Sequence, residues 1–215
     1  MTARGYRFTP QRLAAIVVAS ICALMAAPSV WSQTPVGTFG FRKGMTRAEL
    51  EKLSGPLQEE QPGVFTARRV PSPDAGFKRY GLVITPKTGL CGLLAGGYPI
   101  DVNGAGTEIQ AAFASMRARL SREYGATPRT IDRLGPGSGL TRPGDWSKAL
   151  YKNERVLSAL WRLGPNPSGL RLVELTAGGL SESKALLWLN YTFDVPGGCV
   201  NELKELRRAS LTGTK

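Results

Sequence analysis

The connections between predicted strands constrain the fold of this chain more than any other feature. Phe77–Thr85 alternates in a two-residue pattern, with Tyr80 and Leu82 on one face, which is typical of a half-buried strand. Only the turn Pro86–Gly89 separates it from the next apolar run, residues 90–95. Neighbouring parallel strands need a crossover of about a dozen residues, so these short connections predict antiparallel pairing.

The same order of elements is predicted twice. A short helix, three strands and a second helix fill residues 40–125, and the order returns in residues 141–211, with the Pro- and Gly-rich segment 126–144 as a connecting loop. We therefore expect residues 33–215 to form an α+β domain in which helices pack against an antiparallel sheet, as two α-β-β-β-α halves. The predicted helices are 46–53, 107–124, 145–152 and 200–210, and the predicted strands are 64–70, 77–85, 90–95, 156–163, 170–177 and 185–193.

The first helix has the clearest local signal in the chain. Thr46 can cap it while Glu49, three residues later, reaches back to the Thr46 amide, and Gly55-Pro56 ends it. Thr107 and Gln110 predict a similar capping box for the second helix. The apolar stripe of that helix predicts a place in the core and consists of Ile109, Phe113, Met116, Leu120 and Tyr124.

The segment around this first cap also carries a family resemblance. Gly40–Leu50 (GFRKGMTRAEL) resembles the opening of small periplasmic modules related to the outer-membrane-assembly lipoprotein of the SmpA/OmlA type. It is also similar to the helix-plus-sheet repeats of β-lactamase inhibitory proteins. The resemblance covers Phe39 to about Gly55, and it implies helices on a small antiparallel sheet that binds another macromolecule. The remainder resembles proteobacterial periplasmic proteins and implies no activity, and the chain lacks the acylation cysteine of the lipoproteins.

The N-terminus has three features of a secretory signal peptide, residues 1–32, in the expected order. Three arginines among the first 12 residues precede the apolar run Leu13–Ala27, and Val30–Ser32 offers a small residue before a cut. We expect cleavage near Ser32, or after Ala27, which discards Cys22 and leaves a periplasmic or secreted chain. The alternative is an uncleaved anchor, although a membrane span needs about 20 apolar residues.

Two cysteines, Cys91 and Cys199, remain after that cleavage. An even count in an oxidising compartment predicts a disulfide between them. The alternative is a pair of buried thiols that do not meet.

Net charge indicates the class of partner. The mature chain has 25 basic and 16 acidic residues, a charge of +9, which favours an anionic lipid or glycan or an acidic envelope protein as partner. We expect no nucleic-acid partner. Arginines that converge on an open sheet face would grip phosphates or carboxylates by bidentate contacts. The candidate residues are Arg68, Arg69, Arg79, Arg155, Arg162 and Arg171.

The chain contains no histidine, which excludes Ser-His-Asp and Cys-His catalysis and removes the commonest ligand of catalytic zinc. We expect no cofactor and no metal. Ser138 lacks the glycine that a nucleophile elbow needs two residues earlier. The catalytic candidates that remain are carboxylates near loops or sheet edges: Asp101, Asp132, Asp145, Glu154 and Glu174.

Together these features favour an exported, non-enzymatic protein that binds a macromolecular or anionic envelope partner. The alternative is a carboxylate-dependent hydrolase of envelope glycans, which would need two facing carboxyl groups.

Overall fold

The computed structural model describes residues 38–126, 129–193 and 198–212, so the predicted signal peptide lies outside the described residues. The strands are β1 (Gln58–Gln61), β2 (Val64–Ala67), β3 (Phe77–Thr85), β4 (Gly89–Gly97), β5 (Ile100–Asp101), β6 (Arg129–Leu134), β7 (Arg155–Arg162), β8 (Leu170–Ser181) and β9 (Lys184–Phe193). The helices are α1 (Arg47–Ser54), α2 (Thr107–Tyr124), α3 (Trp146–Tyr151), which follows a short 3₁₀ turn (Pro143–Asp145), and α4 (Cys199–Thr212).

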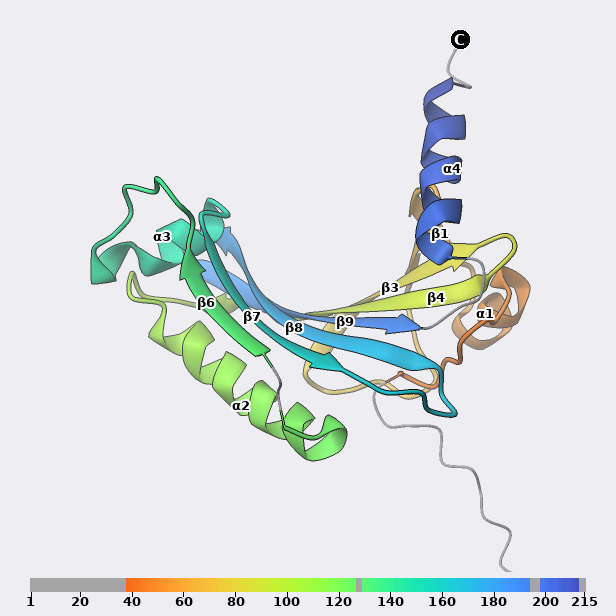
Figure 1. Ribbon diagram of the computed structural model, residues 1–215, viewed down its shortest axis with the longest axis horizontal. Helices are drawn as coiled ribbons and strands as arrows, with labels where there is room; N and C mark the ends of the chain where they lie inside the picture. Colours follow the sequence, from red (N-terminus) through yellow and green to blue (C-terminus); the bar gives the residue numbers. More distant parts are fainter. Residues whose placement is uncertain (1–37, 127–128, 194–197, 213–215) are drawn as a thin grey trace, which may run out of the picture. The chain divides into compact units, whose positions relative to one another are not determined.

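These strands form one antiparallel sheet, in the order β1-β2-β3-β4-β9-β8-β7-β6, with β5 paired to β9 (Figure 1). At its centre β4 and β9, the last strands of the two predicted halves, place Leu93 opposite Tyr191 and Ala95 opposite Leu189. On either side of this pair the strands lie in chain order. Short turns join β1 to β2, β3 to β4 and β8 to β9, whereas the connection from β6 to β7 contains α3. The predicted α+β class and the antiparallel pairing are therefore confirmed.

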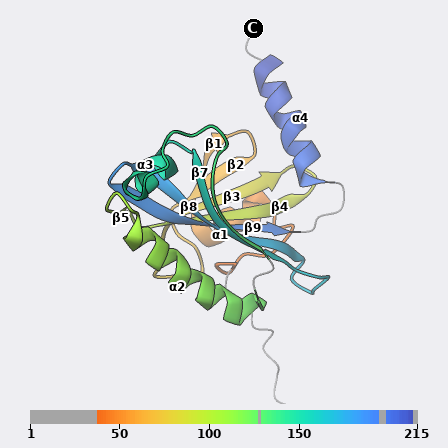
Figure 2. The ribbon, with the colours of Figure 1, turned by 60° about the vertical axis from the view of Figure 1, so that its left-hand side comes forward.

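One face of the sheet carries the core. Val173 of β8 and Leu189 of β9 are fully buried there, in one cluster with Leu50 of α1, Phe113 of α2 and Trp146 of α3. Figures 1 and 2 show α2 running along this face of the sheet. The predicted core stripe of α2 is confirmed, since Ile109, Phe113 and Leu120 are buried and Met116 and Tyr124 pack against the same cluster.

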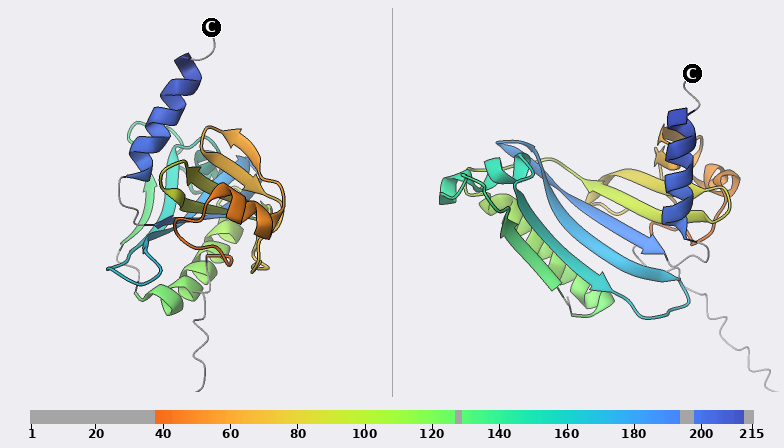
Figure 3. Two further views of the ribbon diagram at one scale, coloured as in Figure 1. Left: turned by 90° about the vertical axis from the view of Figure 1, so that its right-hand side faces the viewer. Right: turned by 45° about the horizontal axis from the view of Figure 1, so that its top comes forward.

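The C-terminal helix stands at the end of the β3–β4 hairpin and rises on the side away from α2 (Figures 1 and 3). Its first residue, Cys199, is bonded to Cys91 of β4, as predicted. One turn later the buried carboxylate of Glu202 accepts hydrogen bonds from the Thr88 hydroxyl and from the Lys87 backbone amide, the latter at 3.0 Å. These two hydrogen bonds, with the Thr88 hydroxyl as the larger cause, lower the pKa of Glu202.

The sequence does not predict three of the strands. The segment 126–144, predicted as a loop, contains β6, whose residues are mostly polar because an edge strand packs on one neighbour only. The fully exposed β1 and the two-residue β5 also lack an apolar pattern.

The predicted capping box of α2 is wrong. The N-cap is Gly106, and its left-handed backbone (φ 68°) places it where a Cβ would lie 2.2 Å from the Trp146 ring. The side chain of Gln110 donates to the carbonyl of Ala105 at 2.8 Å and does not reach back to a capping residue. The Thr107 hydroxyl accepts a hydrogen bond from the side chain of Asn103 at 2.7 Å, and the N-cap residue supplies no side-chain cap.

Candidate binding face of the sheet

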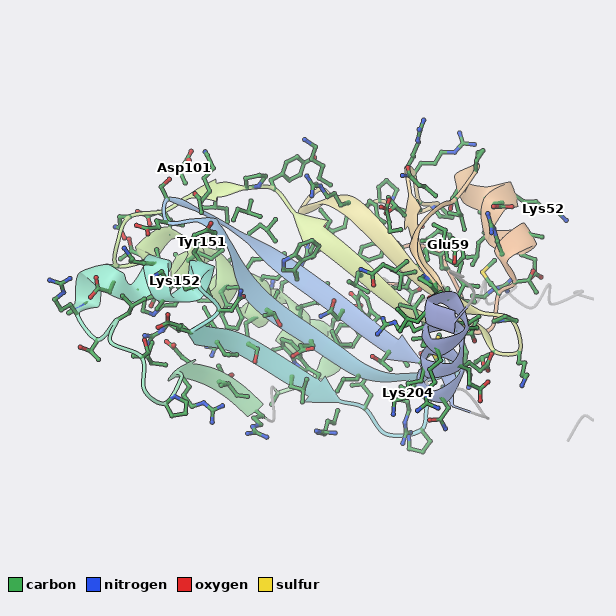
Figure 4. The ribbon with its side chains drawn as sticks, turned by 90° about the horizontal axis from the view of Figure 1, so that it is seen from above. Lys52, Glu59, Asp101, Tyr151, Lys152 and Lys204 are labelled. Carbon is green, nitrogen blue, oxygen red and sulfur yellow. A yellow bond between two sulfur atoms is a disulfide. The ribbon has the colours of Figure 1, made fainter. Side chains whose placement is uncertain are left out.

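The face of the sheet opposite α2 is the candidate functional site. Figure 4 looks onto this face: α4 stands at one end of it, and no helix of the described residues covers the middle of β4, β9 and β8. Strand register orders its side chains into three rows, which we call the open face. The first row runs from β6 to β3 through Ile131, Ser158, Thr176, Trp188, Gly96 and Arg79. The second row also runs from β6 to β3, through Arg129, Leu160, Glu174, Asn190, Leu94 and Gly81. The third row runs from β7 to β3 through Arg162, Leu172, Thr192, Gly92 and Val83.

Trp188 is the largest side chain of the open face and lies between two glycines. A Cβ on Gly96 of β4 would lie 2.7 Å from Cζ3 of the indole, and one on Gly178 of β8 would lie 3.0 Å from its Nε1. The position of the ring therefore depends on the absence of side chains on both neighbouring strands. Because Trp188 is only half-buried, it presents aromatic surface to a partner, and tryptophan is enriched among the residues that dominate binding energy.

Glu174 and Asn190 face each other at the centre of the open face. They are register partners on β8 and β9, and such partners have Cβ atoms about 5 Å apart. The side-chain oxygen of Asn190 is buried and accepts no hydrogen bond from any described residue. A buried acceptor without a donor costs roughly 1–3 kcal/mol, so this oxygen lowers the stability of the sheet at Asn190.

Exposed arginines lie at both ends of the rows. Arg79 ends the first row on β3, and Arg129 and Arg162 end the other rows on β6 and β7. Glu174 is the single carboxylate among the residues of the three rows. Five strand spacings of about 4.8 Å separate β3 from β6, so one ligand that contacts both ends must reach about 24 Å. That length is typical of a macromolecule.

The structure therefore brings two of the six predicted arginines, Arg79 and Arg162, to the open face. Arg155 lies on the core side of β7, where its Nε is 2.8 Å from Asp132 Oδ1 and its guanidinium is 5.1 Å from the centre of the Trp146 ring. The remaining three lie at other positions: Arg68 and Arg69 follow the end of β2 and are exposed, and Arg171 lies at the irregularity near the start of β8.

Sequence reasoning missed Arg129 and the role of Trp188. Arg129 was missed because β6 is mostly polar and has no alternation of polar and apolar residues that would predict a strand. The glycines beside Trp188 come from strands that are distant in sequence, so no local pattern connects them to the indole.

Four of the five candidate carboxylates form an ion pair or a hydrogen bond with another side chain of the protein. Asp101 pairs with Lys184, Asp132 with Arg155, and Asp145 with Arg142 at 3.0 Å, which lowers the pKa of Asp145. The Glu154 carboxylate accepts a hydrogen bond from the Ser138 hydroxyl at 2.5 Å. Glu174 faces the open side of the sheet, away from the core, and has no acidic neighbour in its own row or the rows beside it. The open face thus supplies one carboxyl group, whereas glycoside hydrolysis uses two that face each other across about 5–10 Å.

Within residues 38–126, 129–193 and 198–212, no group of three or more metal-ligating side chains comes together. None of the helices in those segments has the length and hydropathy that a membrane span requires. No known protein family, curated protein or solved structure matches the chain.

Proposed function

We propose that the chain is an exported, non-enzymatic protein that binds the acidic surface of an envelope protein through its open face. The observation that carries this proposal is the position of Trp188, a half-buried aromatic anchor between arginines at both ends of a wide sheet face. Protein interfaces are enriched in tryptophan and arginine, the two residue types that support this proposal.

The charge distribution and the width of the face support a protein partner over a small molecule. Arg79 on one side and Arg129 and Arg162 on the other can be contacted together only by a partner that crosses about five strands. The chain's excess of basic residues would speed its encounter with an acidic surface. The resemblance of Gly40–Leu50 to macromolecule-binding periplasmic modules agrees with this proposal.

Photo-crosslinking from two positions tests the role of the open face. A photoreactive amino acid at Thr176, in the row of Trp188, is expected to cross-link one acidic envelope protein in cells. The same group at Ala118, exposed on α2 on the opposite side of the sheet, is expected to give no such product. If the group at Thr176 cross-links a glycan or a lipid instead, the partner belongs to that class and is not a protein. Equal products from both positions would contradict the role of the open face.

Charge reversal tests the arginines. The variant Arg79→Glu/Arg129→Glu/Arg162→Glu is expected to bind the cross-linked partner at least ten times more weakly than the wild type at low salt. The matched control, Lys52→Glu/Arg122→Glu/Arg207→Glu, changes the net charge equally at exposed positions of α1, α2 and α4. If both variants lose the same affinity, net charge and not the open face determines binding.

Export is a separate part of the proposal. The disulfide of Cys91 and Cys199 agrees with an oxidising compartment. The intact mass of the protein from its native compartment is expected to begin near Gln33, with both cysteines resistant to alkylation until a reductant is added. A full-length mass with two free thiols would contradict export.

A further inference from the structure

A cavity of about 460 Å³ lies where α1, the β3–β4 hairpin and α4 meet, away from the open face. Small-molecule sites in proteins typically have volumes of roughly 300–1,000 Å³. The first turn of α1 forms one side, residues 84–89 form another, and Leu206 of α4 contributes from the C-terminal end of the chain. The α4 helix therefore supplies one side chain of the lining, and α1 and the β3–β4 hairpin supply most of the rest.

The inner walls of this cavity are apolar. Phe65 of β2 and Ile84 of β3 line it, and both are 6% exposed. Leu206, Pro86 and Ala48 add three further apolar side chains. An alkyl chain that binds between these side chains moves from water to an apolar surface that is already formed. This transfer raises the affinity by up to about fourfold for each methylene group.

The mouth of the cavity carries a positive excess. Arg47 and Lys87 line it, and the guanidinium of Arg47 lies 4.9 Å from the centre of the Phe65 ring. The first turn of α1 lies on the same side, and there the Glu49 carboxylate, which accepts the Thr46 amide at 2.7 Å, offsets the positive end of the helix dipole. Glu59 is the acidic lining residue, visible beside α4 in Figure 4, and one of its oxygens accepts the Gly63 amide at 3.1 Å.

From this arrangement we propose that the cavity binds a free medium-chain carboxylate, such as dodecanoate. The alkyl chain lies between Phe65, Ile84 and Leu206, and the carboxylate lies at Arg47 and Lys87. An apolar interior with two cations at its mouth fits an amphiphile with one negative end. This site shares no residue with the open face, so its test is independent of the partner proposed above.

Methyl NMR on the oxidised chain tests the site directly. Dodecanoate is expected to shift the methyl signals of Ile84 and Leu206 and to leave that of Ile131, on the open face, unchanged. Affinity should rise by up to about fourfold per methylene from octanoate to dodecanoate. Dodecylamine, which places a cation at Arg47 and Lys87, should bind at least ten times more weakly. Equal affinity for the amine and the acid would overturn the proposal.

Two substitutions on the exposed side of α1 assign the contacts. Ala48→Phe fills the cavity from a solvent-exposed helix position and is expected to abolish the shifts. Arg47→Gln should weaken dodecanoate severalfold without changing the affinity for dodecan-1-ol. Arg47 is also paired with Glu51 at 2.9 Å, so the matched control is Glu51→Gln, which removes this ion pair and leaves the lining intact. Unchanged binding in Ala48→Phe, or equal losses in Arg47→Gln and Glu51→Gln, would overturn the proposed site.

Discussion

The carboxylate of Glu202 on α4 lies 3.0 Å from the backbone nitrogen of Lys87, a residue 115 positions earlier in the β3–β4 turn. Its other oxygen accepts the hydroxyl of Thr88. Both bonds favour the ionised carboxylate and lower its pKa from the ordinary value of 4.5. One buried carboxylate therefore joins the C-terminal helix to the sheet, beside the disulfide.

This pairing predicts a pH-dependent contribution to stability. A carboxyl group whose pKa is lower in the folded state stabilises the fold above its unfolded pKa, and the contribution is lost as the pH falls through the folded pKa. We expect Glu202→Gln to lower the free energy of unfolding at pH 7, and the difference from the wild type to shrink below pH 4.5. Urea unfolding at pH 7 and at a pH below 4.5 measures the difference in the free energy of unfolding between the two proteins. Glu205→Gln, exposed on the same helix, should follow the wild type, and a difference that is equal at both pH values would contradict the prediction.

The disulfide should account for a larger part of the stability. Cys91 and Cys199 are 108 residues apart, and in the chain-entropy model a loop of that length stabilises the folded state by about 4–5 kcal/mol. We expect a reductant to lower the guanidinium midpoint of the wild type. Cys91→Ala/Cys199→Ala should unfold at the lower midpoint with or without reductant. A midpoint that the reductant does not move would show that the bridge contributes little.

The start of α1 could be predicted because its capping is local. In the structure Thr46 accepts the amide of Glu49, and Glu49 accepts the amide of Thr46 at 2.7 Å. The start of α2 could not, because the hydroxyl of Thr107 is bound by Asn103, and Gly106 is required by the ring of Trp146 from another element. Capping residues therefore identify a helix end only where no distant group competes for them.

Part of the open face could be predicted from the sequence. Alternation predicts that Arg79 and Arg162 point away from the core, and the register confirms it. The proximity of Trp188 to Gly96, and of Glu174 to Asn190, depends on which strands pair and in which register. A two-residue period gives the face of each strand and contains no information about its neighbours.

The capping box of α1 gives a third prediction. Thr46→Ala removes the side chain that accepts the Glu49 amide, and the loss of such a cap typically costs about 1 kcal/mol. Thr46→Ser keeps the hydroxyl and should retain most of the stability. Chemical unfolding of the three proteins at neutral pH provides the comparison. An equal loss in the alanine and serine variants would mean that the methyl group of Thr46, and not its hydroxyl, stabilises the helix.

The last prediction concerns Gly96 and Trp188. Alanine is favoured over glycine inside a strand by about 0.5–1 kcal/mol, so Gly96→Ala would stabilise the sheet if its Cβ had room. That Cβ would instead lie 2.7 Å from the indole, and we expect a net loss of about 1–3 kcal/mol together with a change in tryptophan fluorescence.

A double-mutant cycle assigns this loss to the ring. In a Trp188→Ala background, Gly96→Ala should become neutral or stabilising, because the clash is gone. Gly139→Ala serves as the control for adding a Cβ, since no atom lies within 4 Å of the position. If Gly96→Ala lowers the free energy of unfolding equally with and without the indole, then the backbone of β4, and not the ring of Trp188, requires the glycine.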